Sequence, residues 1–332
     1  MTCTDWSSTG AGLQYAGSTE RENLIWLQER IEYHERGLED LFFGECTKRF
    51  PVETRIAERL QESHHTFWVI TSPEDFGWPT KRPHMFCVAI SKRTCQWIGP
   101  KQTMLQQAFK QRFSRSVELT GDVLFCGPED EAWKLYESMA KTQGNIVSSD
   151  VLKQLPRDEF LETILPPYQL EIYKEYQAVE FDKMSLGGTF VADLQQHEGM
   201  GSTAGPHLPC QLTHGTMMSF RSLADPAEHP RIMTGMEQLG AMGFHLFPST
   251  TQDWPRSPRS SLFRALSNNE QKHISGNGMH LACLSSWLFF IFANIVRVSS
   301  VPCVGKMHRA SSIQALDDED EDLLEESSKA TT

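Results

Sequence analysis

The sequence predicts an α/β protein with half of a doubly wound sheet, an inserted region of helices and loops, and a disordered acidic tail. Two observations predict this fold class. Within the first 100 residues the apolar patterns follow the order helix, strand, helix, strand, strand. The chain of 332 residues is 39% apolar, which is enough to bury the core of one large domain or two modest ones.

The N-terminal segment is predicted to begin as a loop and to continue as a helix and a strand. Residues 1–20 are rich in Gly, Ser and Thr, which is typical of a loop. From Thr19 to about Leu41 apolar residues recur at helical spacing among charges, and Ser18 or Thr19 is placed to cap the helix. The apolar run DLFFGEC then predicts a buried strand that ends at Glu45.

Two more apolar, β-rich runs follow a short predicted helix at residues 51–60. They span residues 65–72 and 84–91, and the turn-forming stretch PEDFGWPTKRP joins them. We therefore expect a β-hairpin at the end of the half-sheet. Beyond it, residues 101–230 predict helices and loops, and no internal repeat is visible in the sequence.

The segment LACLSSWLFFIFANIV, residues 281–296, is nearly all apolar. A membrane span needs about 20 residues. This segment is shorter and also contains Ser and Asn. We therefore expect a buried core helix and no membrane partner.

The net charge of −12 is concentrated at the C-terminus. Between Asp317 and Lys329 there are eight acidic residues and one lysine. Such a like-charge block cannot bury enough apolar surface to order itself, so residues 301–332 predict a disordered tail that either solvates the protein or binds another one. The eight cysteines are scattered singly, and the N-terminus has no basic and apolar leader, which favours reduced thiols inside the cell.

Five short motifs stand in a fixed order along the chain. Their residues are Cys3, Ser7 and Gly10; Glu45; Pro79 and Arg82; Arg231, Thr234, Glu237, Gly243 and Phe244; and Gly276, Asn277 and Gly278. In this order they resemble the DNA (cytosine-5)-methyltransferase family, which has Pro-Cys-x-x-x-Ser-x-x-Gly, Glu-Asn-Val, Pro-Gln-x-Arg-x-Arg, Arg-x-Leu-Thr-x-x-Glu and Gly-Asn-x-Val-Pro segments. The resemblance covers residues 1–297 and only the part of the enzyme from the catalytic-cysteine loop to the C-terminus.

The resemblance implies a partial Rossmann-like, S-adenosylmethionine-dependent methyltransferase sheet and a covalent mechanism. The family adds a thiolate to C6 of a flipped cytosine, so that C5 can take the methyl group. The matching positions imply Cys3 as the nucleophile and Glu45 as the acid at N3 of the base. They imply Arg82 as the contact to the base or to a phosphate.

The resemblance also implies a cofactor, partners and domains. Gly276, Asn277 and Gly278 would contact S-adenosylmethionine. The substrate would be DNA, which implies a nuclear protein, although the family also has a branch that methylates transfer RNA. The implied domains are a catalytic lobe (1–100), a target-recognition-like insert (101–230), a segment that closes the catalytic lobe (231–300) and the disordered tail (301–332).

The sequence departs from the family pattern at several positions. Thr2 replaces the proline before the cysteine, and His84 replaces the second arginine of the arginine segment. The chain contains no Phe-x-Gly-x-Gly, the loop that holds most of S-adenosylmethionine in the family. Three explanations stay open: a truncated sequence, a split enzyme whose second chain supplies the cofactor-binding half, or a degenerate relative. An active enzyme and a catalytically inactive relative that binds nucleic acid or a partner are therefore both open.

One further group of residues has side chains of the types that bind metal ions. His207, Cys210 and His214 form an H-x2-C-x3-H cluster, and these residue types bind zinc. A fourth ligand and a paired C-x2-C are missing, so no metal site is predicted.

Overall fold

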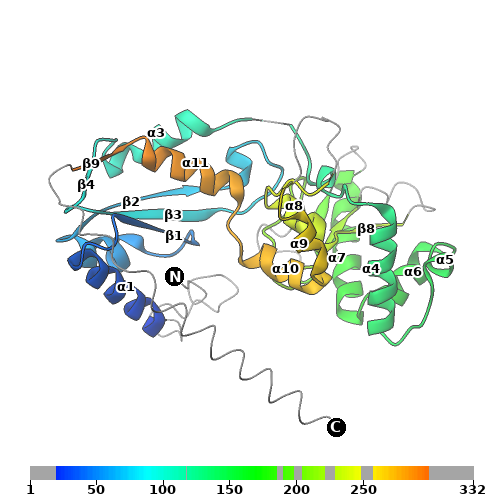
Figure 1. The fold of residues 1–332 in the computed structure, drawn as a ribbon. Helices are drawn as coiled ribbons and strands as arrows, with labels where there is room; N and C mark the ends of the chain where they lie inside the picture. Colours follow the sequence, from blue (N-terminus) through cyan, green and yellow to red (C-terminus); the bar gives the residue numbers. More distant parts are fainter. Residues whose placement is uncertain are drawn as a thin grey trace, which may run out of the picture.

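The computed structural model describes residues 20–116, 118–184, 190–197, 204–220, 229–247 and 257–298. The predicted loop with Cys3 and the predicted acidic tail lie outside these residues. The described residues form two lobes that lie side by side (Figure 1). One lobe is built around an antiparallel sheet of the three predicted strands, not half of a doubly wound sheet, and the other combines helices with a small sheet of its own.

The first lobe is built on a three-stranded sheet of order β1-β3-β2, from strands β1 (Leu41–Thr47), β2 (His64–Thr71) and β3 (His84–Ser91). β3 runs antiparallel to both neighbours, so that Thr47 and Thr71 both stand opposite His84. All β3 residues after His84 are buried, which explains why this strand is a continuous apolar run rather than an alternating one. The three predicted strands and the β2–β3 hairpin are confirmed, with bounds shifted by at most two residues.

Helix α1 (Glu20–Glu35) lies on one face of this sheet together with a π-helical turn, η3 (Glu53–Ala57), and α2 (Glu58–Leu60) (Figure 1). Their apolar side chains pack against Phe42 and Cys46 of β1. α1 ends before the predicted Leu41, because Gly37 adopts a φ of 65° and the amide of Leu38 donates to the carbonyl of Tyr33 at 2.9 Å. A glycine at this position ends the helix.

Helices α3 (Gln102–Phe113) and α11 (Leu281–Phe292) cover the other face. Trp287 of α11 is fully buried against the ring of Phe109, whereas Phe289 is 70% exposed. The predicted helix at 281–296 is therefore too long, since Ile295–Arg297 form strand β9, which pairs with β4 (Cys95–Trp97). Among the residues that the structure describes, no helix is both long and apolar enough to cross a membrane.

The second lobe combines helices with a four-stranded antiparallel sheet of order β6-β5-β7-β8. Its helices are η5 (Gly121–Leu124, a 3-10 turn), α4 (Glu129–Thr142), α5 (Ser149–Leu152), α6 (Arg157–Ile164), α7 (Pro167–Met184), α8 (Gly235–Ala241), α9 (Ser260–Ala265) and α10 (Asn268–Asn277). Its strands are β5 (Val191–Asp193), β6 (Ala204–Gly205), β7 (Met217–Ser219) and β8 (Arg231–Ile232). The sequence predicted only helices and loops for 101–230, which is wrong for β5–β7, because strands this short give no alternating pattern.

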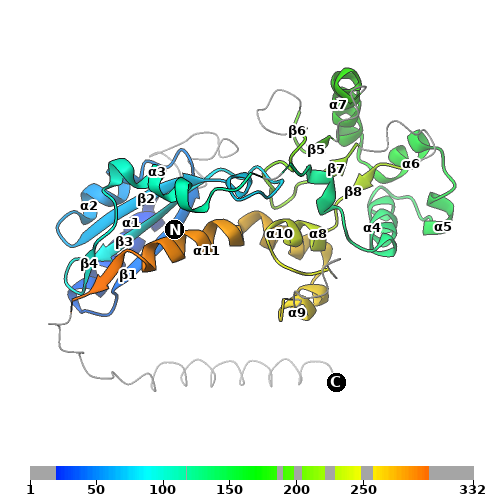
Figure 2. The same cartoon turned by 90° about the horizontal axis from the view of Figure 1, so that it is seen from above.

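The segment before β3 joins the two lobes. It follows the 3-10 turn η4 (Pro73–Asp75). The amide of Lys81 donates to the carbonyl of Leu208, and the amide of Leu208 donates to the carbonyl of Pro79, both at 2.8 Å. The chain returns from α10 to α11 close by, through residues 278–280 (Figure 2). The start of β3 therefore lies where the two lobes meet.

Candidate functional site

Glu45 of β1 and His84 of β3 face each other at this end of the sheet. Oε1 of Glu45 lies 3.6 Å from Nε2 of His84, and the two side chains are 13% and 15% exposed. The sequence predicted that Glu45 would lie at a buried strand end, whereas the structure leaves its side chain 13% exposed and ends the strand two residues later, at Thr47. It gave no role to His84, which it treated only as a departure from the arginine pattern. Glu45 and His84 both stand at positions of the family motifs, and this was the signal in the sequence that could have placed their side chains together.

The imidazole of His84 is neutral near pH 7. Burial, and after it the positive charge of Arg82, lower its pKa to about 4, although a hydrogen bond to the backbone of Arg82 acts in the opposite direction. Its Nδ1 lies 3.2 Å from the carbonyl oxygen of Arg82. Because a neutral imidazole does not form an ion pair, the contact with Glu45 is not a salt bridge at this pH.

Arg82 is buried, and its side chain points to the main chain of the second lobe. Nη1 donates to the carbonyl of Gln211, and Nη2 donates to the carbonyls of Gly276 and Gly278, each at 2.9 Å. Its own amide donates to Oγ of Ser72 at 3.1 Å. These contacts make Arg82 a tie between the lobes, whereas the resemblance implied a contact to the base or a phosphate.

The three residues predicted to contact the cofactor lie at the C-terminal end of α10 and engage their own surroundings. A Cβ on Gly276 would stand 2.4 Å from the amide nitrogen of Thr213, so the helix packs directly on that backbone. The side chain of Asn277 is exposed and lies 3.0 Å from the imidazole of His273 one helical turn earlier. The carbonyl of Gly278 accepts from Arg82. These groups do not form a cradle that fits S-adenosylmethionine.

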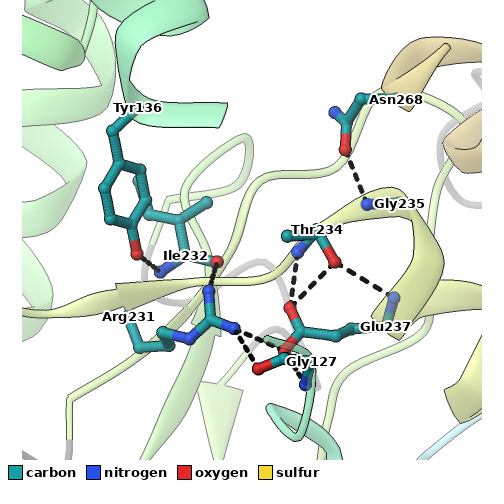
Figure 3. Close-up of polar contacts among 8 residues, drawn as sticks. All are labelled: Gly127, Tyr136, Arg231, Ile232, Thr234, Gly235, Glu237 and Asn268. Carbon is teal, nitrogen blue, oxygen red and sulfur yellow. Dashed lines mark hydrogen bonds and ion pairs between the residues drawn. The ribbon is translucent and has the colours of Figure 1, made fainter. Parts of the chain in front are cut away.

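Arg231, Thr234 and Glu237 of the fourth motif belong to a polar network in the second lobe, with the Glu237 carboxylate buried at its centre (Figure 3). Oε1 of Glu237 accepts from Nη2 of Arg231 at 2.6 Å and from the amide of Gly127 at 2.7 Å. Its Oε2 accepts from the amide and the hydroxyl of Thr234 at 2.7 and 3.0 Å, which forms the capping box of α8. The amide of Ile232 donates to the hydroxyl of Tyr136 beside it. Every oxygen of this carboxylate is therefore used to hold β8, α8 and the start of α4 together.

The cysteines near the site are protonated thiols. Burial raises the pKa of Cys87 to about 12 and also raises the pKa values of Cys210 and Cys283. His207, in the cluster considered for zinc, lies 3.5 Å from Glu74. No group of three or more His, Cys, Asp or Glu residues within the described ranges is placed to hold a metal ion.

A separate groove of about 1120 Å³ lies in the second lobe, between α4 and α10. Lys134, Gln169, His214 and Lys272 contribute to its lining. The residues of the candidate site at the start of β3 do not line it. The groove and the candidate site are therefore different features of the molecule.

Neither a protein-family model nor a curated protein matches the sequence. Among solved structures, the chain is similar to the Entamoeba histolytica methyltransferase EhMeth, with 14% identity over 76% of this chain and a TM-score of 0.37. It is also similar to a mutant of Spodoptera frugiperda DNMT2 (14%, 76% and 0.36) and to the S. pombe Dnmt2 methyltransferase (13%, 77% and 0.38). The chain spans 62% to 66% of these structures, slightly less than two thirds of each. These values are too low to assign a family, so any assignment depends on the residues and contacts of this chain.

Proposed function

We propose that this chain is a DNA (cytosine-5)-methyltransferase-like protein that engages a cytosine through Cys3 and Glu45. The order of the five motifs supports this proposal, and one structural observation is central to it. Glu45 lies partly enclosed at a strand end, opposite the residue that replaces the family's second arginine. An acid in such a place is suited to donate a proton in a site with little water.

The reaction that we assign to these residues extends only to the covalent adduct between Cys3 and the base. The Cys3 thiolate forms a bond to C6 of the base, and the electron pair released from the C5–C6 double bond moves onto the ring. Glu45 donates its proton at N3, which removes the negative charge that would otherwise build up there. Because C6 is inaccessible in a duplex, the target base must be flipped out.

Arg82 supports the site indirectly in this proposal. Its guanidinium holds the main chain at Gly276, Gly278 and Gln211, so the second lobe stays fixed beside β3. We therefore assign Arg82 a positioning role instead of the base contact expected from the sequence. S-adenosylmethionine is the methyl donor that the resemblance implies, and a second chain that supplies the cofactor-binding half is part of the proposal.

Covalent trapping tests the proposed adduct without a methyl donor. 5-Azacytosine has a nitrogen in place of C5, which makes C6 more electrophilic. Wild-type protein is incubated with duplex DNA or transfer RNA that contains 5-azacytosine, and the adduct is mapped by mass spectrometry. We expect an adduct at Cys3, which Cys3→Ala abolishes, and formation slowed about 100-fold by Glu45→Gln.

The control is Cys126→Ala, because Cys126 is an exposed thiol of the second lobe, beside the Glu237 network and not at the strand end that carries Glu45. It should trap as fast as wild type. An adduct at another cysteine, or no adduct with either nucleic acid, would contradict the proposal. The nucleic acid that traps faster identifies the substrate, and a DNA substrate would favour a nuclear protein.

The second candidate is a catalytically inactive relative that binds nucleic acid or a partner. The contacts of Gly276, Asn277 and Gly278 favour it, because these groups do not fit the cofactor. It predicts that nucleic acid binds with equal affinity to wild type and Cys3→Ala. It also predicts no transfer of label from methyl-labelled S-adenosylmethionine, whereas label on cytosine would exclude it.

A further inference from the structure

We propose that Gln102 and Gln106 of α3 act as a substitute strand, which closes the edge of the sheet at β2 to a second copy of this chain. β2 is an edge strand in the order β1-β3-β2, so within the described residues no strand pairs with its outer side. Two side-chain carboxamides occupy that side instead. This inference does not depend on the proposed function.

Each glutamine bonds to both main-chain groups of one β2 residue. The amide of Trp68 donates to Oε1 of Gln102 at 3.1 Å, and Nε2 of Gln102 donates to the carbonyl of Trp68 at 2.9 Å. The amide of Ile70 donates to Oε1 of Gln106, and Nε2 of Gln106 donates to the carbonyl of Ile70, both at 2.8 Å. An antiparallel strand makes the same pair of bonds with every second residue of its neighbour. The two carboxamides therefore replace a strand at two successive positions.

The spacing of the two glutamines matches the spacing of the strand. Residues four apart in an α-helix lie on one face and are separated by about 6 Å along the helix axis. Every second residue of a strand directs its N–H and C=O to the same side, at a repeat of about 6.7 Å. Leu105 and Phe109 of the same helix are buried among the apolar side chains of β2 and β3, which fixes α3 beside β2. α3 therefore holds both carboxamides in register with the edge.

The sequence of β2 offers no other protection at this edge. Edge strands commonly avoid pairing with other chains through charged residues, proline, bulges or short length. β2 (HHTFWVIT) has eight residues, contains no Asp, Glu, Lys, Arg, Pro or Gly, and pairs with β3 without a bulge. Aromatic and β-branched residues dominate it, and this composition favours the pairing of identical strands. The partner that the glutamines exclude is therefore β2 of a second copy.

Methionine substitutions separate the carboxamides from the helix that carries them. Gln102→Met and Gln106→Met remove the hydrogen-bonding groups and keep a long side chain of similar helix propensity. Gln107→Met is the matched control, because Gln107 is exposed on the same helix, next to Gln106. All three variants add the same apolar group, so a general effect of added apolar surface would appear in the control as well.

The first test is hydrogen exchange, measured by NMR on the full chain at low protein concentration. Gln102→Met should speed exchange at the amide of Trp68 at least about tenfold and leave the amide of Ile70 near its wild-type rate. Gln106→Met should do the reverse. Each carboxamide is thereby assigned to the one residue that it covers.

The internal reference for this test is the amide of Val69, which faces β3 and should exchange at the wild-type rate in every variant. Gln107→Met should leave all three amides unchanged. Wild-type exchange at Trp68 and Ile70 in the single variants would overturn the proposed cover. Exchange that rises equally at all three amides would also overturn it, because β2 as a whole would then have opened.

The second test is self-association of the double variant, Gln102→Met with Gln106→Met, followed by sedimentation velocity over a series of protein concentrations. We expect it to associate at concentrations where wild type and Gln107→Met do not, and slow exchange at Trp68 and Ile70 to return as the complex forms. A double variant that sediments as wild type does throughout would overturn the exclusion of a second copy. Association with continued fast exchange at both amides would do the same, because the contact would then lie elsewhere.

Discussion

Each lobe has a glutamate that belongs to one of the motifs, Glu45 in β1 and Glu237 in the first turn of α8, and the two have different surroundings. Glu237 is fully buried and accepts from a cation, two amides and a hydroxyl. Glu45 faces a neutral imidazole across a contact slightly too long for a hydrogen bond. The carboxylate of Glu237, whose oxygens are all used, stabilises structure, whereas the contact of Glu45 with the neutral imidazole of His84 is not an ion pair. The resemblance did not separate these roles, because both glutamates belong to its motifs.

The strongest test of this difference is to remove the carboxyl group of Glu237. Glu237→Ala leaves Arg231 beside a buried space with no counter-charge, and should lower the free energy of unfolding by about 3–5 kcal/mol. Chemical denaturation measures this change. Glu45→Gln is the matched substitution in the other lobe and should cost less than about 1 kcal/mol. Equal losses at the two positions would mean that Glu45 is also structural.

A smaller loss is expected when the tie between the lobes is cut. Arg82→Met keeps much of the length of the side chain and removes its hydrogen bonds to Gln211, Gly276 and Gly278. Three carbonyls then lose a charged donor, which should cost about 2–3 kcal/mol. Hydrogen exchange should increase at the end of α10 more than in the core of α4. Exchange that rises equally in both helices would contradict a local tie.

The smallest effect should appear as a difference in acid stability. His84 has a folded pKa of about 4 against 6.5 in the unfolded chain, so the unfolded state binds more protons between these values. Stability is therefore lost as the pH falls from 6.5 toward 4. The contribution is about 2 kcal/mol, less than the full shift because the ring is partly exposed.

Denaturation of wild type and His84→Gln at several pH values isolates this contribution, because the other histidines titrate in both proteins. The variant should lose about 2 kcal/mol less than wild type on acidification. Glu237 does not add to the loss, since burial raises its pKa and a proton there favours the folded state. Parallel pH curves would show that His84 is not held neutral by the fold.

The sequence predicted the features that depend on neighbouring residues. The apolar runs of β1–β3 are local patterns, and the structure forms strands there as expected. The end of α1 was missed because one glycine at positive φ overrides the helical spacing of the apolar residues. The role of Arg82 was unreadable, because its partners at Gln211 and Gly276 are far away in the sequence and contribute only their carbonyls. Any residue can supply a main-chain carbonyl, so such partners cannot be recognised from the sequence.

The position of Arg82 in the chain has a mechanical consequence. Its guanidinium binds the second lobe, and its own carbonyl binds the imidazole two residues further along. A rotation of the second lobe would pull on the guanidinium and tilt the peptide that holds His84. The second lobe is thus connected to the imidazole of His84 through a single residue, and that imidazole lies 3.6 Å from Glu45.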